Sequence, residues 1–194
     1  MSYSFLATGR RVLEIEAAAI SAQITSINSQ FEQTCERILA ARGRVIVTGM
    51  GKSGHIAAKV AATFASTGTP AFFVHPAEAS HGDLGMITPE DIVLAFSNSG
   101  ETSEVLAILP VLKRRNIPLI SLTGRPDSTL ATQADIHIPV IVHEEACPLN
   151  LAPTSSTTAA LAMGDALAIA LLEARGFSRS EERRVGKECR SRWS

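Results

Sequence analysis

Apolar and polar positions alternate along the chain in two different periods, which predict helices and strands in turn. Apolar residues recur at steps of three or four between Ile20 and Phe31 and again at Ile38, which predicts one long amphipathic helix that ends before Gly43. Five short runs rich in β-branched or aromatic residues follow this segment and predict strands. They span residues 44–48, 71–74, 92–96, 118–122 and 136–142.

Helical patterns separate most of these predicted strands, around residues 55–64, 104–115 and 157–173. Strands that alternate with helices favour parallel pairing through helical crossovers. The sequence therefore predicts an α/β fold: a doubly wound, mostly parallel five-stranded sheet with helices on both faces, as in a flavodoxin-like α-β-α sandwich. In such sheets ligands bind beyond the carboxyl ends of the strands, where both glycine-containing loops of this chain are expected.

The composition of the chain limits the kinds of molecule that the protein is expected to bind. The 194 residues include 45% hydrophobic residues, enough for one domain, and the formal net charge of −1 provides no basic field for nucleic acid or acidic membranes. Three cysteines without metal-ligand spacing fit thiols kept reduced in a cytoplasm. No targeting segment is evident, and we expect no apolar run that approaches the ~20 residues needed to span a bilayer. We therefore expect a soluble cytoplasmic protein with a small-molecule partner.

Residues Ser97 to Thr102 read Ser-Asn-Ser-Gly-Glu-Thr and lie between a predicted strand and a predicted helix. This order brings hydroxyls and free backbone N–H groups to a helix N-terminus, where a phosphate dianion is stabilised by hydrogen bonds and by the helix dipole. Capping of the helix by Ser97, Ser99 and Thr102 is the alternative interpretation, and the two are compatible. The motif predicts binding of a phosphorylated small molecule.

A second loop, Gly49 to Gly54, follows the first strand and matches the dinucleotide fingerprint of three spaced glycines. A nicotinamide enzyme would also carry an acidic residue at the end of the second strand, but His75 and Pro76 stand there. The nucleotide P-loop is excluded because Ile46 occupies the position of its first glycine. What remains is a glycine turn that lets the backbone approach an anion, with Lys52 as a cation and Ser53 as a hydroxyl donor.

Four separated segments carry a resemblance to a known family. Residues 49–55, 75–85 with His-Gly-Asp, 97–104, and 145–165 beginning Glu-Ala-Cys-Pro are similar to the sugar isomerase (SIS) domain of D-arabinose 5-phosphate isomerases. The resemblance implies interconversion of D-arabinose 5-phosphate and D-ribulose 5-phosphate through an enediol, an early step toward Kdo and lipopolysaccharide. It implies no redox cofactor and a homotetramer with active sites between subunits.

The resemblance also implies roles for individual residues. Moving a carbonyl from C1 to C2 needs a base, a proton return and charge stabilisation. The implied catalytic residues are Lys52, His81, Glu104 and Glu145. The implied substrate-binding residues are Gly51, Ser53, Gly68, Thr69, Ser97, Asn98, Ser99 and Thr102. His75 resembles a position at which relatives hold an inhibitory zinc ion. Three of these residues also have a simpler interpretation from the local sequence alone. Glu104 could be an ordinary carboxylate in the first turn of a helix, Glu145 a solvated charge, and His81 a solvent-exposed loop histidine without a role.

The chain departs from the family pattern at its C-terminal end. We expect residues 1–177 to form the SIS domain and residues 178–194 to be a non-native tail, because the sequence becomes rich in Arg and Glu from residue 178 on. Relatives continue into a His-Pro-Gly-Gly motif and paired CBS domains, whereas this chain has no histidine after His143. Turnover is expected to be impaired for that reason. A non-catalytic sugar-phosphate sensor is therefore the main alternative, and a nicotinamide oxidoreductase is the disfavoured one.

Overall fold

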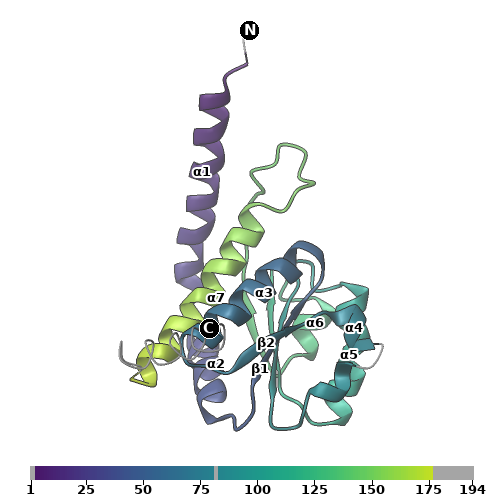
Figure 1. Ribbon diagram of the computed structural model, residues 1–194. Helices are drawn as coiled ribbons and strands as arrows, with labels where there is room; N and C mark the ends of the chain where they lie inside the picture. Colours follow the sequence, from purple (N-terminus) through teal and green to yellow (C-terminus); the bar gives the residue numbers. More distant parts are fainter. Residues whose placement is uncertain (1–2, 81–82, 177–194) are drawn as a thin grey trace, which may run out of the picture.

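Five parallel strands form the centre of the molecule in the computed structural model, which describes residues 3–80 and 83–176. The strand order is β2-β1-β3-β4-β5, and every pairing is parallel (Figure 1). This is the order of flavodoxin-like doubly wound sheets, so the predicted fold class is confirmed. The strands are β1 (Val45–Gly49), β2 (Ala71–Val74), β3 (Ile92–Phe96), β4 (Leu119–Thr123) and β5 (Ile136–Pro139).

Helices cover both faces of the sheet because its central strands are apolar on both sides. On one face, Val47 and Leu94 pack with α2 (Ser29–Ala40), α3 (Gly51–Ser66) and α7 (Ser155–Ala174). On the other face, Ile46 and Val93 pack with α4 (Pro76–Ser80), α5 (Ser103–Arg114) and α6 (Thr129–Gln133). A 3₁₀ turn, η2 (Asp83–Met86), follows α4.

The long first helix of the sequence prediction is wrong, because the chain forms two helices there. Helix α1 (Phe5–Ala22) passes through a 3₁₀ turn, η1 (Gln23–Ser26), before α2 begins at Ser29. Asn28 has extended backbone angles, and its side chain accepts a hydrogen bond of 2.9 Å from the Gln30 N–H. Asparagine is a preferred N-cap, so Asn28 begins a new helix within an otherwise helical period.

Helix α7 corrects a second expectation. Its 20 residues are long and apolar enough to cross a membrane by length and composition, whereas we expected no such run. In the fold α7 packs against α3 and α1, and Leu167, Ala168 and Leu171 are fully buried. A core helix that contacts neighbours on several sides is apolar around most of its circumference. The apolar residues of α7 that face α3 and α1 are explained by this packing, while others, such as Ile169, are exposed.

Candidate functional site

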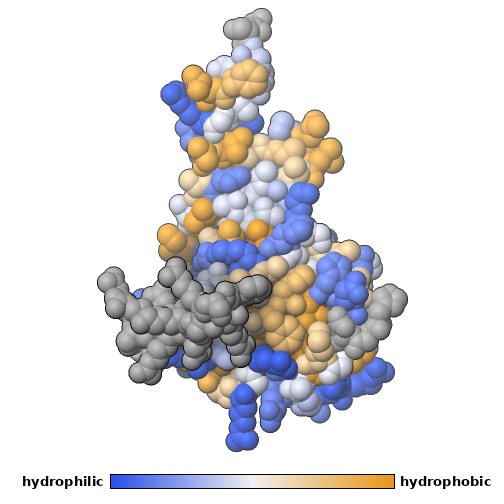
Figure 2. Space-filling view, viewed as in Figure 1, coloured by the Kyte–Doolittle hydropathy of each residue, from blue (hydrophilic) through white to orange (hydrophobic). Residues whose placement is uncertain are grey.

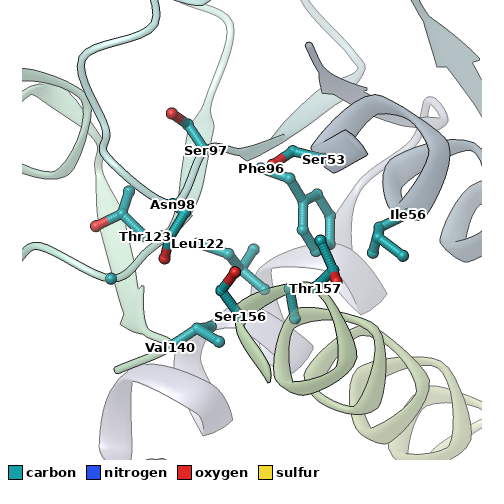
Figure 3. A pocket seen from close by; sticks show the side chains of 12 residues that line it. Ser53, Ile56, Phe96, Ser97, Asn98, Leu122, Thr123, Val140, Ser156 and Thr157 are labelled. Carbon is teal, nitrogen blue, oxygen red and sulfur yellow. The ribbon is translucent and has the colours of Figure 1, made fainter. Parts of the chain in front are cut away.

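A pocket opens at the carboxyl edge of the sheet, beyond the ends of β3, β4 and β5 (Figure 3). The strand order reverses between β1 and β3, which leaves a crevice at their carboxyl ends. Phe96, Leu122 and Val140 supply apolar walls, and hydroxyl groups come from the first turns of α3 and α7. The lining residues are Ser53, Ile56, Phe96, Ser97, Asn98, Leu122, Thr123, Gly124, Val140, Ser156, Thr157 and Ala160.

The Ser97–Thr102 loop is held by its own hydroxyl groups. The buried Ser97 Oγ lies 2.9 Å from Thr102 Oγ1 and accepts a hydrogen bond of 3.1 Å from the Gly100 N–H. Ser99 Oγ accepts from the Glu101 N–H at 3.2 Å. Thr102, at the N-cap of α5, makes no side-chain capping bond. The hydroxyls of the loop thus bond within it, and the capping interpretation is not supported by the described contacts.

The N-cap residues of α3 and α5 make no side-chain capping bond. Asn28 and Ser128 cap α2 and α6 through their side chains, but Met50 and Thr102 provide no such bond for α3 and α5. The first N–H groups of an α-helix have no partner within the helix. Helix α3 starts at the pocket, which Ser53 lines, and α5 follows the loop whose Ser97 and Asn98 line it, so backbone donors and dipole ends at this edge of the sheet favour an anion.

The glycine loop before α3 depends on close backbone approach. Gly51 has a φ of +57°, and a Cβ on Gly54 would lie 2.6 Å from the Gly49 carbonyl oxygen. Only glycine fits both conditions without strain. The turn places Ser53 at the pocket and leaves Lys52 exposed at the start of α3.

Glu104 lies in the first turn of α5 and is half-buried. Its own backbone N–H and the Ser103 hydroxyl, at 2.9 Å from Oε2, donate hydrogen bonds to the carboxylate, and His75 lies within electrostatic range of it. These donors lower the pKa of Glu104, so the side chain is ionised at neutral pH. An ionised carboxylate beside an anion-binding helix end can accept a proton from carbon.

Glu145 lies in the loop between β5 and α7, and one of its oxygens is fully engaged. Oε2 accepts hydrogen bonds from the Thr154 N–H at 2.7 Å, the Thr154 hydroxyl at 2.9 Å and the Ser156 N–H at 3.2 Å. Partial burial acts to raise the pKa of Glu145, but the donors from Ser156 and Thr154 outweigh it and lower the pKa. Glu145 therefore caps α7 as an ionised group and is not a solvated charge.

A protein-family model matches the part of the chain that contains the sheet, the glycine turn and the serine-rich loop. The SIS domain model matches residues 38–170, which is more than half of the chain. The chain belongs to the SIS domain family.

Relatives of this SIS domain include named isomerases. Arabinose 5-phosphate isomerase KdsD of Escherichia coli strain K12 is 60% identical over 176 residues, which cover 91% of this chain and 54% of that protein. KdsD of Pseudomonas aeruginosa is 59% identical over 174 residues, covering 90% of this chain and 53% of that protein. The chain therefore spans about half the length of the curated relatives that it matches.

One solved structure is similar over nearly its whole length. The structure of E. coli CFT073 c3406 in complex with arabinose 5-phosphate is 44% identical, has a TM-score of 0.90 and covers 93% of this chain and 96% of that one. Identity at this level over a whole SIS domain supports a shared arrangement of strands and loops.

The fold brings most of the predicted site residues of the SIS domain to one edge of the sheet. Gly51, Lys52 and Ser53 follow β1, residues 97–104 follow β3, and Glu145 precedes α7. Gly68 and Thr69 lie at the opposite edge, just before β2 begins, where the Thr69 N–H donates to the Phe64 carbonyl at the end of α3. A single chain does not bring these two residues to the pocket, and their predicted role stays untested.

Two of the predicted site residues are histidines. His81 falls outside the residues that the structure describes, so its predicted relay role stays a prediction. His75 follows β2, and its Nδ1 atom is buried without a hydrogen-bond partner in the described part of the chain. Within residues 3–80 and 83–176, no group of three or more His, Cys, Asp or Glu side chains could hold a metal ion. His75 with Glu104 nearby supplies fewer ligands than a structural zinc site needs.

Other residues complete the pocket wall. Ser156 and Thr157 line it; they belong to the hydroxyl cluster 154–158, for which the sequence predicts helix capping first and ligand lining second. Thr123 and Gly124 also line it, from the end of β4. The signal for Gly124 is its position directly after a strand, since parallel strands end at one common edge. Glu101 accepts from the Thr129 N–H of α6 at 2.6 Å, which links two neighbouring loops of this edge.

Proposed function

We propose that this SIS domain is an aldose-ketose isomerase that interconverts D-arabinose 5-phosphate and D-ribulose 5-phosphate through an enediol. The observation that carries the proposal is the 44% identity, over nearly all of both chains, to a structure in complex with arabinose 5-phosphate. The names of the KdsD relatives support the same reaction. We further propose a role early in Kdo and lipopolysaccharide synthesis, in the cytoplasm.

The phosphate of the substrate is proposed to bind at the first turn of α5. Backbone N–H groups without a side-chain cap, together with Ser97, Asn98, Ser99 and Thr102, offer the donors that a dianion requires. Ser53 at the start of α3 supplies a further donor from the facing side of the crevice (Figure 3). The backbone of Gly51, at the start of the same helix, is proposed to approach the phosphate as well. Binding the phosphate at one end fixes the distance of C1 and C2 from the catalytic groups.

The isomerisation is proposed to use Glu104, Glu145 and Lys52. One carboxylate removes the C2 proton of the aldose and the proton returns to C1, while the oxygens exchange a proton between them. Lys52, exposed at the mouth of the site, neutralises the negative charge that develops on the enediolate oxygens. His81 is proposed to assist opening of the sugar ring.

A homotetramer accompanies the proposed activity. Helix α1 projects from the domain (Figure 1), and several of its large apolar side chains are exposed. Apolar side chains along one helix that face water in a single chain indicate burial against another chain. We propose that the partner is a second copy of this chain.

Formation of ribulose 5-phosphate from arabinose 5-phosphate tests the function directly. Proton NMR in deuterated water should show loss of the C2 proton signal with the 194-residue chain and with a version extended by the His-Pro-Gly-Gly segment of relatives. Exchange or product in either chain supports the isomerase. Protection of the melting temperature by arabinose 5-phosphate, with neither exchange nor product in either chain, would instead support a sugar-phosphate sensor.

A further inference from the structure

Glu145 and Thr154 join the two ends of the segment 145–154, which is part of the loop between β5 and α7. The Thr154 hydroxyl donates to Glu145 Oε2 at 2.9 Å and accepts from the Ala146 N–H at 2.9 Å. The Thr154 N–H donates to the same carboxylate oxygen at 2.7 Å. One side chain thus bonds to two consecutive residues at the other end of the loop, and we call this set of bonds the 145–154 clasp.

The clasp fixes the Glu145 carboxylate. Oε2 accepts hydrogen bonds from the Thr154 N–H, the Thr154 hydroxyl and the Ser156 N–H, and the Ser156 side chain also donates to the carboxylate. A carboxylate anchored through one oxygen cannot rotate freely, and restricted orientation is a large part of the advantage of a bound catalytic group. The donors also stabilise the ionised form, which is the form that accepts a proton.

Thr154 contributes a hydroxyl group, which serine would also provide at this position and valine would not. It immediately precedes α7 but makes no side-chain capping bond to that helix, so its hydroxyl is committed to Glu145 and Ala146. Cap residues are normally explained by bonds to their own helix. The geometry here requires another explanation for a hydroxyl at this position.

We propose that Thr154 is a positioning residue for the isomerisation, which fixes the orientation and the ionised state of the Glu145 carboxylate. The proposal rests on the proposed function, because Glu145 must take part in proton transfer. Thr154→Val keeps the shape and the backbone N–H but removes the hydroxyl bond to Glu145. Loss of one hydrogen bond to a charged group corresponds to about a ten- to hundredfold change in a rate constant.

The test compares the wild-type chain with Thr154→Val, Thr154→Ser and, as a matched control, Thr132→Val. Thr132 lies on α6, where its hydroxyl bonds to backbone carbonyl oxygens of its own helix region. We expect Thr154→Val to lower kcat about ten- to hundredfold with little change in KM and to move the acidic limb of the kcat profile to higher pH. Thr154→Ser should restore both, and Thr132→Val should match the wild type.

A second readout does not depend on turnover. Carbon NMR of chains labelled at the glutamate carboxyl, with Glu145→Gln to identify the signal, gives the titration of Glu145 in each variant. We expect a higher pKa of Glu145 in Thr154→Val and a wild-type value in Thr154→Ser. An unchanged titration, or a kcat loss that serine does not restore, overturns the role of Thr154. Absence of C2 exchange in both the 194-residue chain and its extended version overturns the proposed function itself, and this proposal with it.

Discussion

Glu104 and Glu145 are both ionised carboxylates, but the structure holds them differently. Glu145 serves as the cap of α7 through Oε2, whereas the described contacts of Glu104 are local ones to Ser103 and to its own backbone. Replacement by glutamine therefore affects them differently. At Glu145 it removes both a proton acceptor and a charged cap, and at Glu104 it removes a proton acceptor with little structural consequence.

Glu104→Gln is expected to lower the rate of C2 exchange by about a hundred- to ten-thousandfold, because a positioned base contributes about that much. The described contacts of Glu104 are local, so the melting temperature should stay near the wild-type value. Proton NMR in deuterated water measures exchange, and thermal shift with arabinose 5-phosphate measures binding. Glu90→Gln, on the exposed turn before β3, is the matched control. Wild-type exchange in Glu104→Gln would exclude Glu104 as a required proton acceptor.

Gly100 meets two constraints at once in the serine-rich loop. Its φ is +66°, and a Cβ would collide with the Ser128 side chain, which caps α6. We expect Gly100→Ala to lower the free energy of unfolding by about 1 to 3 kcal/mol and to weaken sugar-phosphate binding, since Ser97 loses its loop geometry. Chemical denaturation and thermal shift measure the two effects. Gly9→Ala, in α1 with open space around it, should not destabilise.

At the scale of elements, Asp91 joins the amino ends of β1 and β3. The buried carboxylate accepts from the Arg44 N–H at 2.7 Å, and from the N–H and hydroxyl of Thr88 at 2.7 and 3.0 Å. Burial acts to raise the pKa of Asp91, but these donors outweigh it and lower the pKa. A carboxylate with a folded pKa below its unfolded one stabilises the fold above the unfolded value.

Asp91→Asn is expected to lower the free energy of unfolding by about 3 kcal/mol at pH 7, because a buried acceptor of charge-assisted bonds is lost. The difference from wild type should shrink as the pH falls below about 4, the ordinary Asp value, and through the lower folded pKa. Urea denaturation at several pH values measures this. Asp127→Asn is the control, since its ion pair with Arg125 is exposed and contributes less than about 1 kcal/mol. Equal losses under neutral and strongly acidic conditions would contradict this account.

Some helices and strands could be predicted from the sequence, whereas contacts between distant residues could not. The strands 71–74 and 92–96 match their predicted bounds because β-branched and aromatic runs between breakers leave little choice. The break at Asn28 was missed because the apolar period continues through it. The bond between Glu101 and α6 joins residues 28 positions apart, and the 145–154 clasp depends on loop closure. Local pattern carries no information on such contacts.

At the scale of the whole molecule, α1 has two stripes of side chains, one that packs on the domain and one that is exposed. Residues at spacings of three and four, which are less exposed than their neighbours, face the domain where α1 packs on α7. A second stripe follows a spacing of seven and is exposed, as the orange patches on the projecting helix in Figure 2 illustrate. The first stripe is Thr8, Val12, Ile15 and Ala19, and the second is Leu6, Leu13 and Ile20, exposed by 75, 69 and 40%.

Leu13→Glu is expected to dissociate the proposed tetramer, because a buried leucine contributes about 1.5 to 3 kcal/mol and a buried unpaired carboxylate costs more. The substitution occurs once in each copy, so a symmetric assembly loses the contribution several times. Light scattering after size-exclusion chromatography measures the mass of each species. Circular dichroism should remain that of the wild type, since Leu13 belongs to the exposed stripe and not to the one that packs on α7.

Ser21→Glu provides the control for charge, since Ser21 is exposed on α1 outside the second stripe and bonds to its own helix through the Ala17 carbonyl. It should retain the wild-type mass. If active sites form between subunits, Leu13→Glu should also lose C2 exchange at low protein concentration and regain part of it as concentration rises. A Leu13→Glu chain with wild-type mass would show that the exposed stripe of α1 does not carry the assembly. Exchange that is independent of concentration in a dissociated variant would show that one subunit holds a complete site.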